Sequence, residues 1–96
     1  MTIKIHQLPH SHPLFFRDYD YAGEENFAFS NYSCVYTGTV PEQSLEDIFC
    51  LFNQDLPSDF TGHSLSVSDI VEVVESSSIA PGLYFCNTIG WKKVAA

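Results

Sequence analysis

Apolar and polar residues alternate in two stretches of the first half of the chain. Ile3 and Ile5 are separated by polar neighbours, so residues 2–8 are predicted to form a short β-strand. The same period of two from residue 27 to 37 predicts a second strand, with Cys34 and Tyr36 on one face. Each strand would then turn one of its faces toward a core.

Residues 9–26 lie between these strands and show no stable period. They include Pro13, Gly23 and scattered charged residues, which is typical of a long surface loop. Aromatic side chains are expected to hold part of this loop against the core. These side chains are Phe15, Phe16, Tyr19 and Tyr21.

A helical period appears between Ser44 and Asn53. Apolar residues recur there at spacings of three and four, which places them on one stripe of an α-helix. They are Leu45, Ile48, Phe49 and Phe52. Ser44 can cap the first turn, and the acidic residues that follow lie at the positive end of the helix dipole.

β-Branched residues dominate the segment that ends near Glu75. Ser66 and Asp69 have the spacing of a capping box, so we expect one helical turn at 67–70 and then a strand to Glu75. Further strands are predicted at 83–87 and 91–94.

The order of these elements predicts an α+β fold. We expect a small, mostly antiparallel β-sheet packed against one main helix, with a C-terminal β-meander. At 96 residues, the chain is expected to form a single domain over residues 1–96.

The chain is acidic, with 12 acidic and 4 basic residues and a formal net charge of −8. Such a charge repels phosphate groups, so we expect no direct binding to nucleic acid and none to an anionic membrane. The charge can serve solubility or steer the protein toward a basic partner, and both interpretations remain open.

Three cysteines occur, Cys34, Cys50 and Cys86, without the spacing of a metal or redox motif. Because each lies in a predicted apolar element, all three are predicted to be reduced thiols in the core. No signal segment and no apolar run long enough to span a membrane is present in the sequence. We therefore expect a cytoplasmic protein.

The most suggestive polar cluster lies between residues 60 and 74. His63, Ser64 and Asp69 are the residue types of a hydrolytic triad, but no nucleophile-elbow pattern surrounds the serines. Capping and turn formation by Ser66 and Asp69 is the simpler interpretation. The third interpretation of this cluster is a contact with a partner protein.

Other chemistry has weaker support in the sequence. His6, His10 and His12 lie near Asp18 and Asp20 but lack the spacing of common zinc ligands. No phosphate-binding or dinucleotide-binding glycine motif is present. We therefore predict no catalytic residue, no metal site and no cofactor.

Several stretches resemble the YodL-like family of small bacterial domains. They are residues 45–49, 52–53, 57–60, 62–73 and 82–94, and more loosely 2–7 and 16–19. The resemblance thus covers nearly the whole chain. It implies a domain of Gram-positive mobile elements, often encoded near antirestriction proteins, and it transfers no catalytic residue.

These observations favour a non-enzymatic protein-interaction module, a regulator or inhibitor whose protein partner is unidentified. The predicted contact residues are His63, Ser64, Asp69 and Trp91, and partial exposure is expected of Trp91. One alternative is an acidic DNA-mimic decoy against a defence nuclease. Another is a hydrolase-like enzyme that uses His63, Ser64 and Asp69. A homodimer formed through a sheet edge also remains open.

Overall fold

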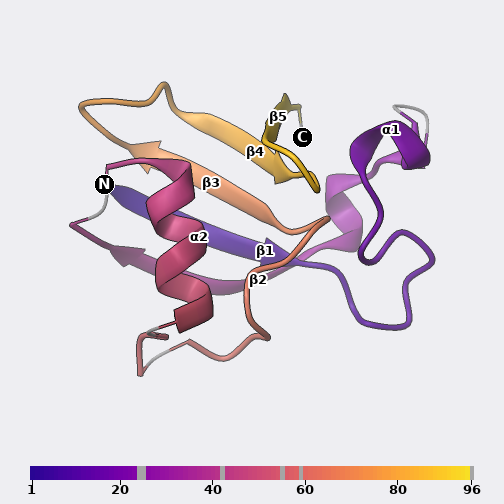
Figure 1. Cartoon of the computed structure of the whole chain (residues 1–96), viewed down its shortest axis with the longest axis horizontal. Helices are drawn as coiled ribbons and strands as arrows, with labels where there is room; N and C mark the ends of the chain where they lie inside the picture. The colour runs from indigo at the N-terminus through magenta and orange to yellow at the C-terminus, as the bar shows by residue number, and fades with distance from the viewer. Residues whose placement is uncertain (24–25, 42, 55, 59, 96) are drawn as a thin grey trace.

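The computed structural model describes residues 1–23, 26–41, 43–54, 56–58 and 60–95. Its strands are β1 (Thr2–Gln7), β2 (Ser33–Thr39), β3 (Ile70–Glu75), β4 (Gly82–Cys86) and β5 (Trp91–Val94). Its helices are α1 (Tyr19–Ala22), the 3₁₀-helix η2 (Phe29–Asn31) and α2 (Leu45–Gln54). The strands form one antiparallel sheet with α2 across it, which confirms the predicted α+β fold (Figure 1).

The spatial order of the sheet is β2-β1-β3-β4-β5. β1 pairs with β2 on one side and with β3 on the other. The N-terminal strand is therefore internal, and β2 and β5 form the two edges of the sheet. In the described part of the chain, no helix is long and apolar enough to cross a membrane.

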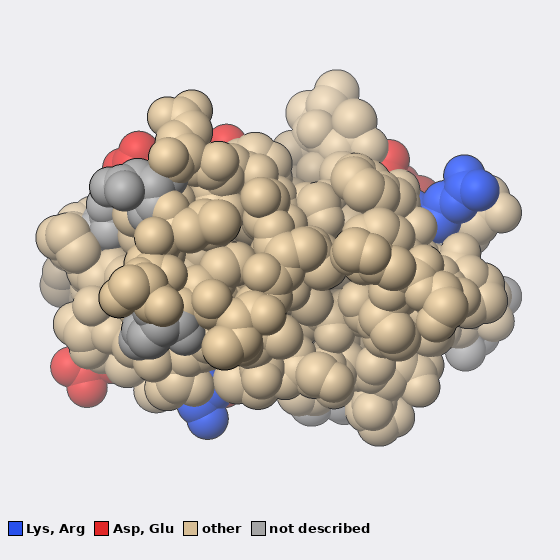
Figure 2. Space-filling view, turned by 90° about the horizontal axis from the view of Figure 1, so that it is seen from below, with Lys and Arg blue, Asp and Glu red and all other residues tan. Residues whose placement is uncertain are grey.

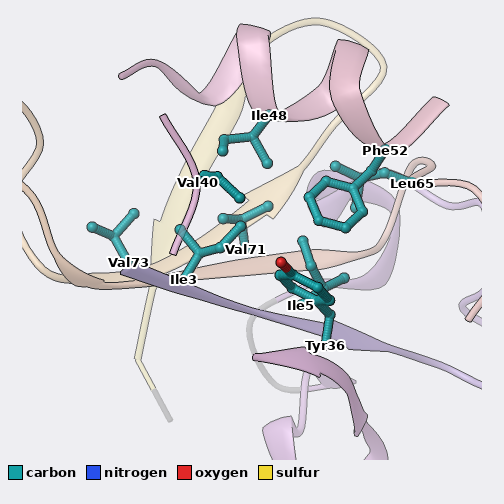
Figure 3. Close-up of a cluster of buried hydrophobic side chains, with 9 residues drawn as sticks. All are labelled: Ile3, Ile5, Tyr36, Val40, Ile48, Phe52, Leu65, Val71 and Val73. Atoms are coloured by element: carbon teal, nitrogen blue, oxygen red, sulfur yellow. The ribbon is translucent and has the colours of Figure 1, made fainter. Parts of the chain in front are cut away.

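The main core lies between α2 and one face of the sheet (Figure 3). Ile3 and Ile5 of β1 and Ile48 and Phe52 of α2 are fully buried in it. The buried members of this cluster are Ile3, Ile5, Tyr36, Val40, Ile48, Phe52, Leu65, Val71 and Val73. The predicted apolar stripe of the helix is confirmed, and Ser44 Oγ caps α2 by accepting a hydrogen bond of 3.1 Å from Asp47 N.

Aromatic residues between 19 and 32 cover a second cluster. This cluster contains Ile70, Leu83 and Phe85, which pack against Tyr19, Phe27, Phe29, Tyr32 and Val94. Because Ile70 and Val71 are adjacent in β3, their side chains point to opposite faces of the sheet. The predicted docking is confirmed for Tyr19, whereas Phe16 and Tyr21 are 61% and 66% exposed.

The first loop and the second strand differ from the prediction. The predicted loop contains α1, and its residues 24–25 lie outside the described part of the chain. The predicted strand begins six positions later than expected, at Ser33, because η2 occupies part of the segment before it. Phe27 and Phe29 therefore pack against the sheet instead of pairing within it.

A bulge in β2 explains why the prediction of a buried Cys34 is wrong. The register passes from Ile5 opposite Tyr36 to His6 opposite Cys34, so Val35 has no residue opposite it. The extra residue reverses the alternation of the strand, and Cys34 is exposed although Tyr36 is buried.

The prediction of a core thiol is also wrong for Cys50. It lies on α2 outside the apolar stripe and is exposed. Cys86 on β4 is buried, as predicted.

Candidate functional site

A tight turn leads the chain into β3. Asp69 Oδ2 accepts hydrogen bonds from Ser66 N at 2.8 Å and from Ser66 Oγ at 3.4 Å. Ser68 has a φ of 81°, which excludes the predicted helical turn at 67–70. The Asp69 carboxylate therefore closes a turn on its N-terminal side rather than a helix.

Gln7, at the end of β1, holds this turn from the sheet. Its side chain is buried, and its Nε2 donates to Asp69 Oδ2 at 3.0 Å and to the carbonyl oxygen of His63 at 2.8 Å. Its Oε1 accepts a hydrogen bond of 3.2 Å from His63 N. Gly62 permits this approach, because a Cβ at that position would collide with Gln7 Oε1.

The His63 ring is fixed by a backbone group. Its Nδ1 lies 2.8 Å from the carbonyl oxygen of Ser64 and 3.3 Å from Gln7 Nε2. The carbonyl oxygen can only accept, so the shorter contact requires the proton on Nδ1. Its centroid lies 4.7 Å from that of His10 and 5.2 Å from that of Phe15. His63 Nε2 is buried and has no hydrogen-bond partner among the described residues.

Two open hollows flank this His10–His63 pair. One has a volume of about 440 Å³ and is lined by residues 7–10, 31, 33, 35 and 61–63. The other has a volume of about 530 Å³ and is lined by residues 10, 15–16, 53 and 63–66. None of these residues is Asp, Glu, Lys or Arg.

The two hollows belong to a side of the molecule with few charges. The segment after α2 and the loop after β1 run along the lower side of Figure 1. Figure 2 looks at this side and shows described Lys, Arg, Asp and Glu side chains only near its margins. We call the residues that line the two hollows the neutral face.

Asp69 places a buried carboxyl group beneath the neutral face. Burial raises the pKa of its carboxyl to about 7, although the hydrogen bonds from Ser66 and Gln7 favour ionisation. Its Oδ1 is buried without a hydrogen-bond partner among the described residues. Burial, and secondarily the charge of Asp69, also raises the pKa of the Tyr32 hydroxyl and raises that of the Cys86 thiol to about 12.

Two residues with left-handed backbones meet beside Asp69. Phe16 has a φ of 68° and Ser68 a φ of 81°, and Phe16 N donates a hydrogen bond of 3.1 Å to Ser68 Oγ. Tyr32 Oη donates to the carbonyl oxygen of Ser68 at 2.6 Å. A left-handed backbone is strained for a bulky residue. The conformation of Phe16 therefore costs free energy that the rest of the fold must offset.

Trp91 lies in a different environment. Its Nε1 donates a hydrogen bond of 2.8 Å to Glu46 Oε1, which ties β5 to α2. It borders a hollow of about 100 Å³ that shares no lining residue with the two hollows of the neutral face. The structure therefore brings together His63, Ser64 and Asp69 but leaves Trp91 outside this group.

The other histidines serve separate contacts. His6 Nε2 lies 2.8 Å from Glu72 Oε1 of β3, and His12 Nδ1 accepts a hydrogen bond of 3.1 Å from Leu14 N. Within the ranges that the structure describes, no group of three or more His, Cys, Asp and Glu residues could hold a metal ion.

Sequence reasoning missed Gln7, His10, Phe15 and Tyr32 as members of this site. Gln7 carries a weak signal, since a glutamine that ends an alternating strand needs hydrogen-bond partners if it is buried. The sequence indicates the other three only in other roles: His10 as a candidate metal ligand, Phe15 as an aromatic residue that docks the loop, and Tyr32 as part of a predicted strand.

The YodL-like domain family model matches residues 2–96. No curated protein and no solved structure matches the chain. The family match includes all strands and helices described above, and it confirms the resemblance seen in the separate sequence stretches. The chain belongs to the YodL-like domain family.

Proposed function

We propose that this chain is a non-enzymatic protein-interaction module, a regulator or inhibitor that binds another protein through the neutral face. The observation that carries the proposal is the composition of that face in a chain of net charge −8. The two adjoining hollows have no Asp, Glu, Lys or Arg in their lining, and the exposed Phe16 lines one of them. This combination matches the apolar centre and aromatic anchors of protein interfaces.

His63, Ser64 and Asp69 have different roles in this proposal. His63 and Ser64 line the hollows and would contact the partner directly. Asp69 is fully buried and would act as a positioning residue, because it holds Gln7 and the turn that carries His63. Trp91 is not part of the proposed contact surface.

A hydrolase-like function has less geometric support. A triad needs a histidine nitrogen that accepts a hydrogen bond from a serine hydroxyl. His63 Nδ1 is committed to the Ser64 carbonyl, and no serine hydroxyl bonds to His63 within the described part of the chain. We therefore propose that no residue here is catalytic and that no cofactor is required.

The salt dependence of binding distinguishes the acidic decoy from our proposal. A decoy binds through its carboxylates, so its affinity falls steeply as salt is added. Binding through the neutral face is expected to change little with salt. A cytoplasmic setting within a mobile element is part of the proposal, and the exposed free thiols of Cys34 and Cys50 are consistent with a reducing compartment.

The test compares two arginine substitutions at exposed serines. Ser64→Arg places a charge on the neutral face, and Ser77→Arg makes the same change in net charge in the connection between β3 and β4. Each purified protein is immobilised, and proteins captured from lysate of the source bacterium are quantified at low and high salt.

We expect a protein that wild type and Ser77→Arg retain at both salt concentrations and that Ser64→Arg loses. Equal capture by both variants would reject the neutral face as the contact surface. Capture that disappears at high salt with every protein would favour the decoy.

A further inference from the structure

The two edges of the sheet are protected very differently. β5 carries Lys92 and Lys93, and charged residues on an edge strand discourage pairing with another sheet. β2 is longer and has no charged residue, and neither does the sequence from Asn26 to Pro41 around it. A further strand can therefore pair more readily with β2 than with β5.

The backbone of β2 presents unpaired groups along this edge. Met1 and Val40 exchange reciprocal hydrogen bonds of 2.7 and 2.9 Å, so Val40 directs both backbone groups toward β1. In an antiparallel pair such residues alternate with residues whose groups point away. Thr39 and Thr37 therefore direct their N–H and C=O groups outward, where no partner occurs among the described residues.

The free edge has a defined length. At its N-terminal end, the Val35 carbonyl oxygen already accepts a hydrogen bond of 3.2 Å from Thr61 Oγ1. At its C-terminal end, Pro41 has no N–H group to donate. Only Thr37 and Thr39 remain open to pairing.

We propose that β2 pairs antiparallel with β2 of a second copy of this chain, about a two-fold axis at Gly38. In this register, Thr37 of each copy lies opposite Thr39 of the other, and each such pair exchanges both of its backbone hydrogen bonds. The pairing thus uses the outward groups that the fold leaves open and stops where Thr61 and Pro41 end the edge.

A second copy fits this edge because Thr37 and Thr39 lie symmetrically about Gly38 and therefore match the same two residues of an identical strand. Each copy has a net charge of −8, so two copies repel one another over most approaches. The uncharged edge lets two strands meet without opposing like charges, and Thr–Thr neighbours are favourable across antiparallel strands. Both threonines are exposed. Thr39 Oγ1 already lies 3.1 Å from Thr2 Oγ1, and Thr37 Oγ1 lies 3.6 Å from Cys34 Sγ, so the pairing rests on the open backbone groups rather than on the hydroxyls.

A single strand edge gives a small interface. A stable complex typically buries on the order of 1,600 Å² in total, and this contact would bury less, so the dimer depends on protein concentration. Added salt should increase the dimer population, because it screens repulsion between the acidic copies. This inference does not rest on the proposed binding function, and its test needs no partner protein.

The test compares two substitutions at Thr37. Thr37→Pro removes the outward N–H but no hydrogen bond to β1, so an edge strand tolerates it. Thr37→Val keeps the backbone donor and the branched shape. The mass in solution is measured by sedimentation equilibrium up to millimolar concentration, and amide hydrogen exchange is followed in wild type.

We expect wild type and Thr37→Val to approach twice the monomer mass of 10.8 kDa as concentration rises, while Thr37→Pro stays monomeric. In wild type, exchange at the Thr37 and Thr39 amides should slow roughly tenfold when nine-tenths of the chains are paired. These amides report the pairing even if Thr37→Pro does not fold. A monomeric mass throughout, a dimer of folded Thr37→Pro, or exchange at these amides that ignores concentration would overturn the proposal.

Discussion

The side-chain amide of Gln7 donates a hydrogen bond of 3.0 Å to the carboxylate of Asp69, and this contact joins the end of β1 to the start of β3 across 62 residues. The same amide group binds the backbone of His63 on both its N–H and C=O sides. One glutamine thus couples the sheet, the buried carboxylate and the histidine of the neutral face. Substitution of Gln7 should therefore affect the sheet, the buried carboxylate and His63 together.

Gln7→Ala should lower the free energy of unfolding by about 2–4 kcal/mol. The substitution removes a partner from Asp69, which keeps its hydrogen bonds from Ser66, and from two backbone groups of the partly exposed His63. Each loss therefore lies toward the low end of the range of about 1–3 kcal/mol for an unsatisfied group. Urea denaturation checks this. Gln43→Ala removes an exposed glutamine and serves as the control, with an expected change below about 0.5 kcal/mol. Equal effects of the two substitutions would contradict the role of Gln7.

Asp69 should make the protein less stable as pH rises. The pKa of its carboxyl is about 7 in the folded protein and 3.8 in an ordinary environment, so the folded state holds the proton more tightly in between. The contribution of Asp69 is fully present below about pH 4 and is lost as pH rises to about 7.

The measurement is the free energy of unfolding from pH 4 to 8. Wild type should lose about 1–4 kcal/mol more than Asp69→Asn across this window, because the amide does not titrate. Asp20→Asn, at an exposed carboxylate of α1, should retain the wild-type slope. An Asp69→Asn variant with that same slope would show that another group is responsible.

The reactivity of the three thiols should follow their exposure. Cys34 and Cys50 are exposed, whereas Cys86 is buried and its pKa is raised to about 12 by burial and by nearby carboxylates. A thiol reagent such as DTNB should therefore modify Cys34 and Cys50 in the native protein and Cys86 only after denaturation. Cys34→Ser and Cys50→Ser should each remove one of the native reactions. Rapid native reaction of Cys86 would contradict its placement.

At position 16, glycine should give a more stable protein than alanine. Its φ of 68° is costly for any residue with a Cβ, by about 1–2 kcal/mol. Phe16→Gly should therefore be more stable than Phe16→Ala by about 1 kcal/mol, even though glycine is the more flexible residue when unfolded. Both variants lose the exposed ring and should weaken partner binding equally. Thermal denaturation and capture assays check the two parts separately, and greater stability of Phe16→Ala would contradict the strain.

Much of the fold could be predicted because it depends on short-range periodicity. The alternation at Ile3 and Ile5, the stripe of α2 with its Ser44 cap, and the limits of β5 agree with the structure. Each of these features is set by residues two to four positions apart. The predicted turn chemistry of Asp69 was right in kind, but its carboxylate closes a non-helical turn.

The site was predicted only in part. His63, Ser64 and Asp69 lie together because they belong to one short segment. Gln7 and His10 come from the other end of the chain, and their approach depends on β1 lying next to β3. Sequence spacing carries no information about such a neighbour.

By itself the sequence determined the acidic charge, the principal helix and strands, and the membership of the YodL-like domain family. Only the tertiary structure decided the strand order, the bulge that exposes Cys34, the separation of Trp91 from His63, and the burial of Asp69. The physical reason is that local periodicity selects the face of one element. Burial and electrostatics instead depend on which distant segments pack against that face.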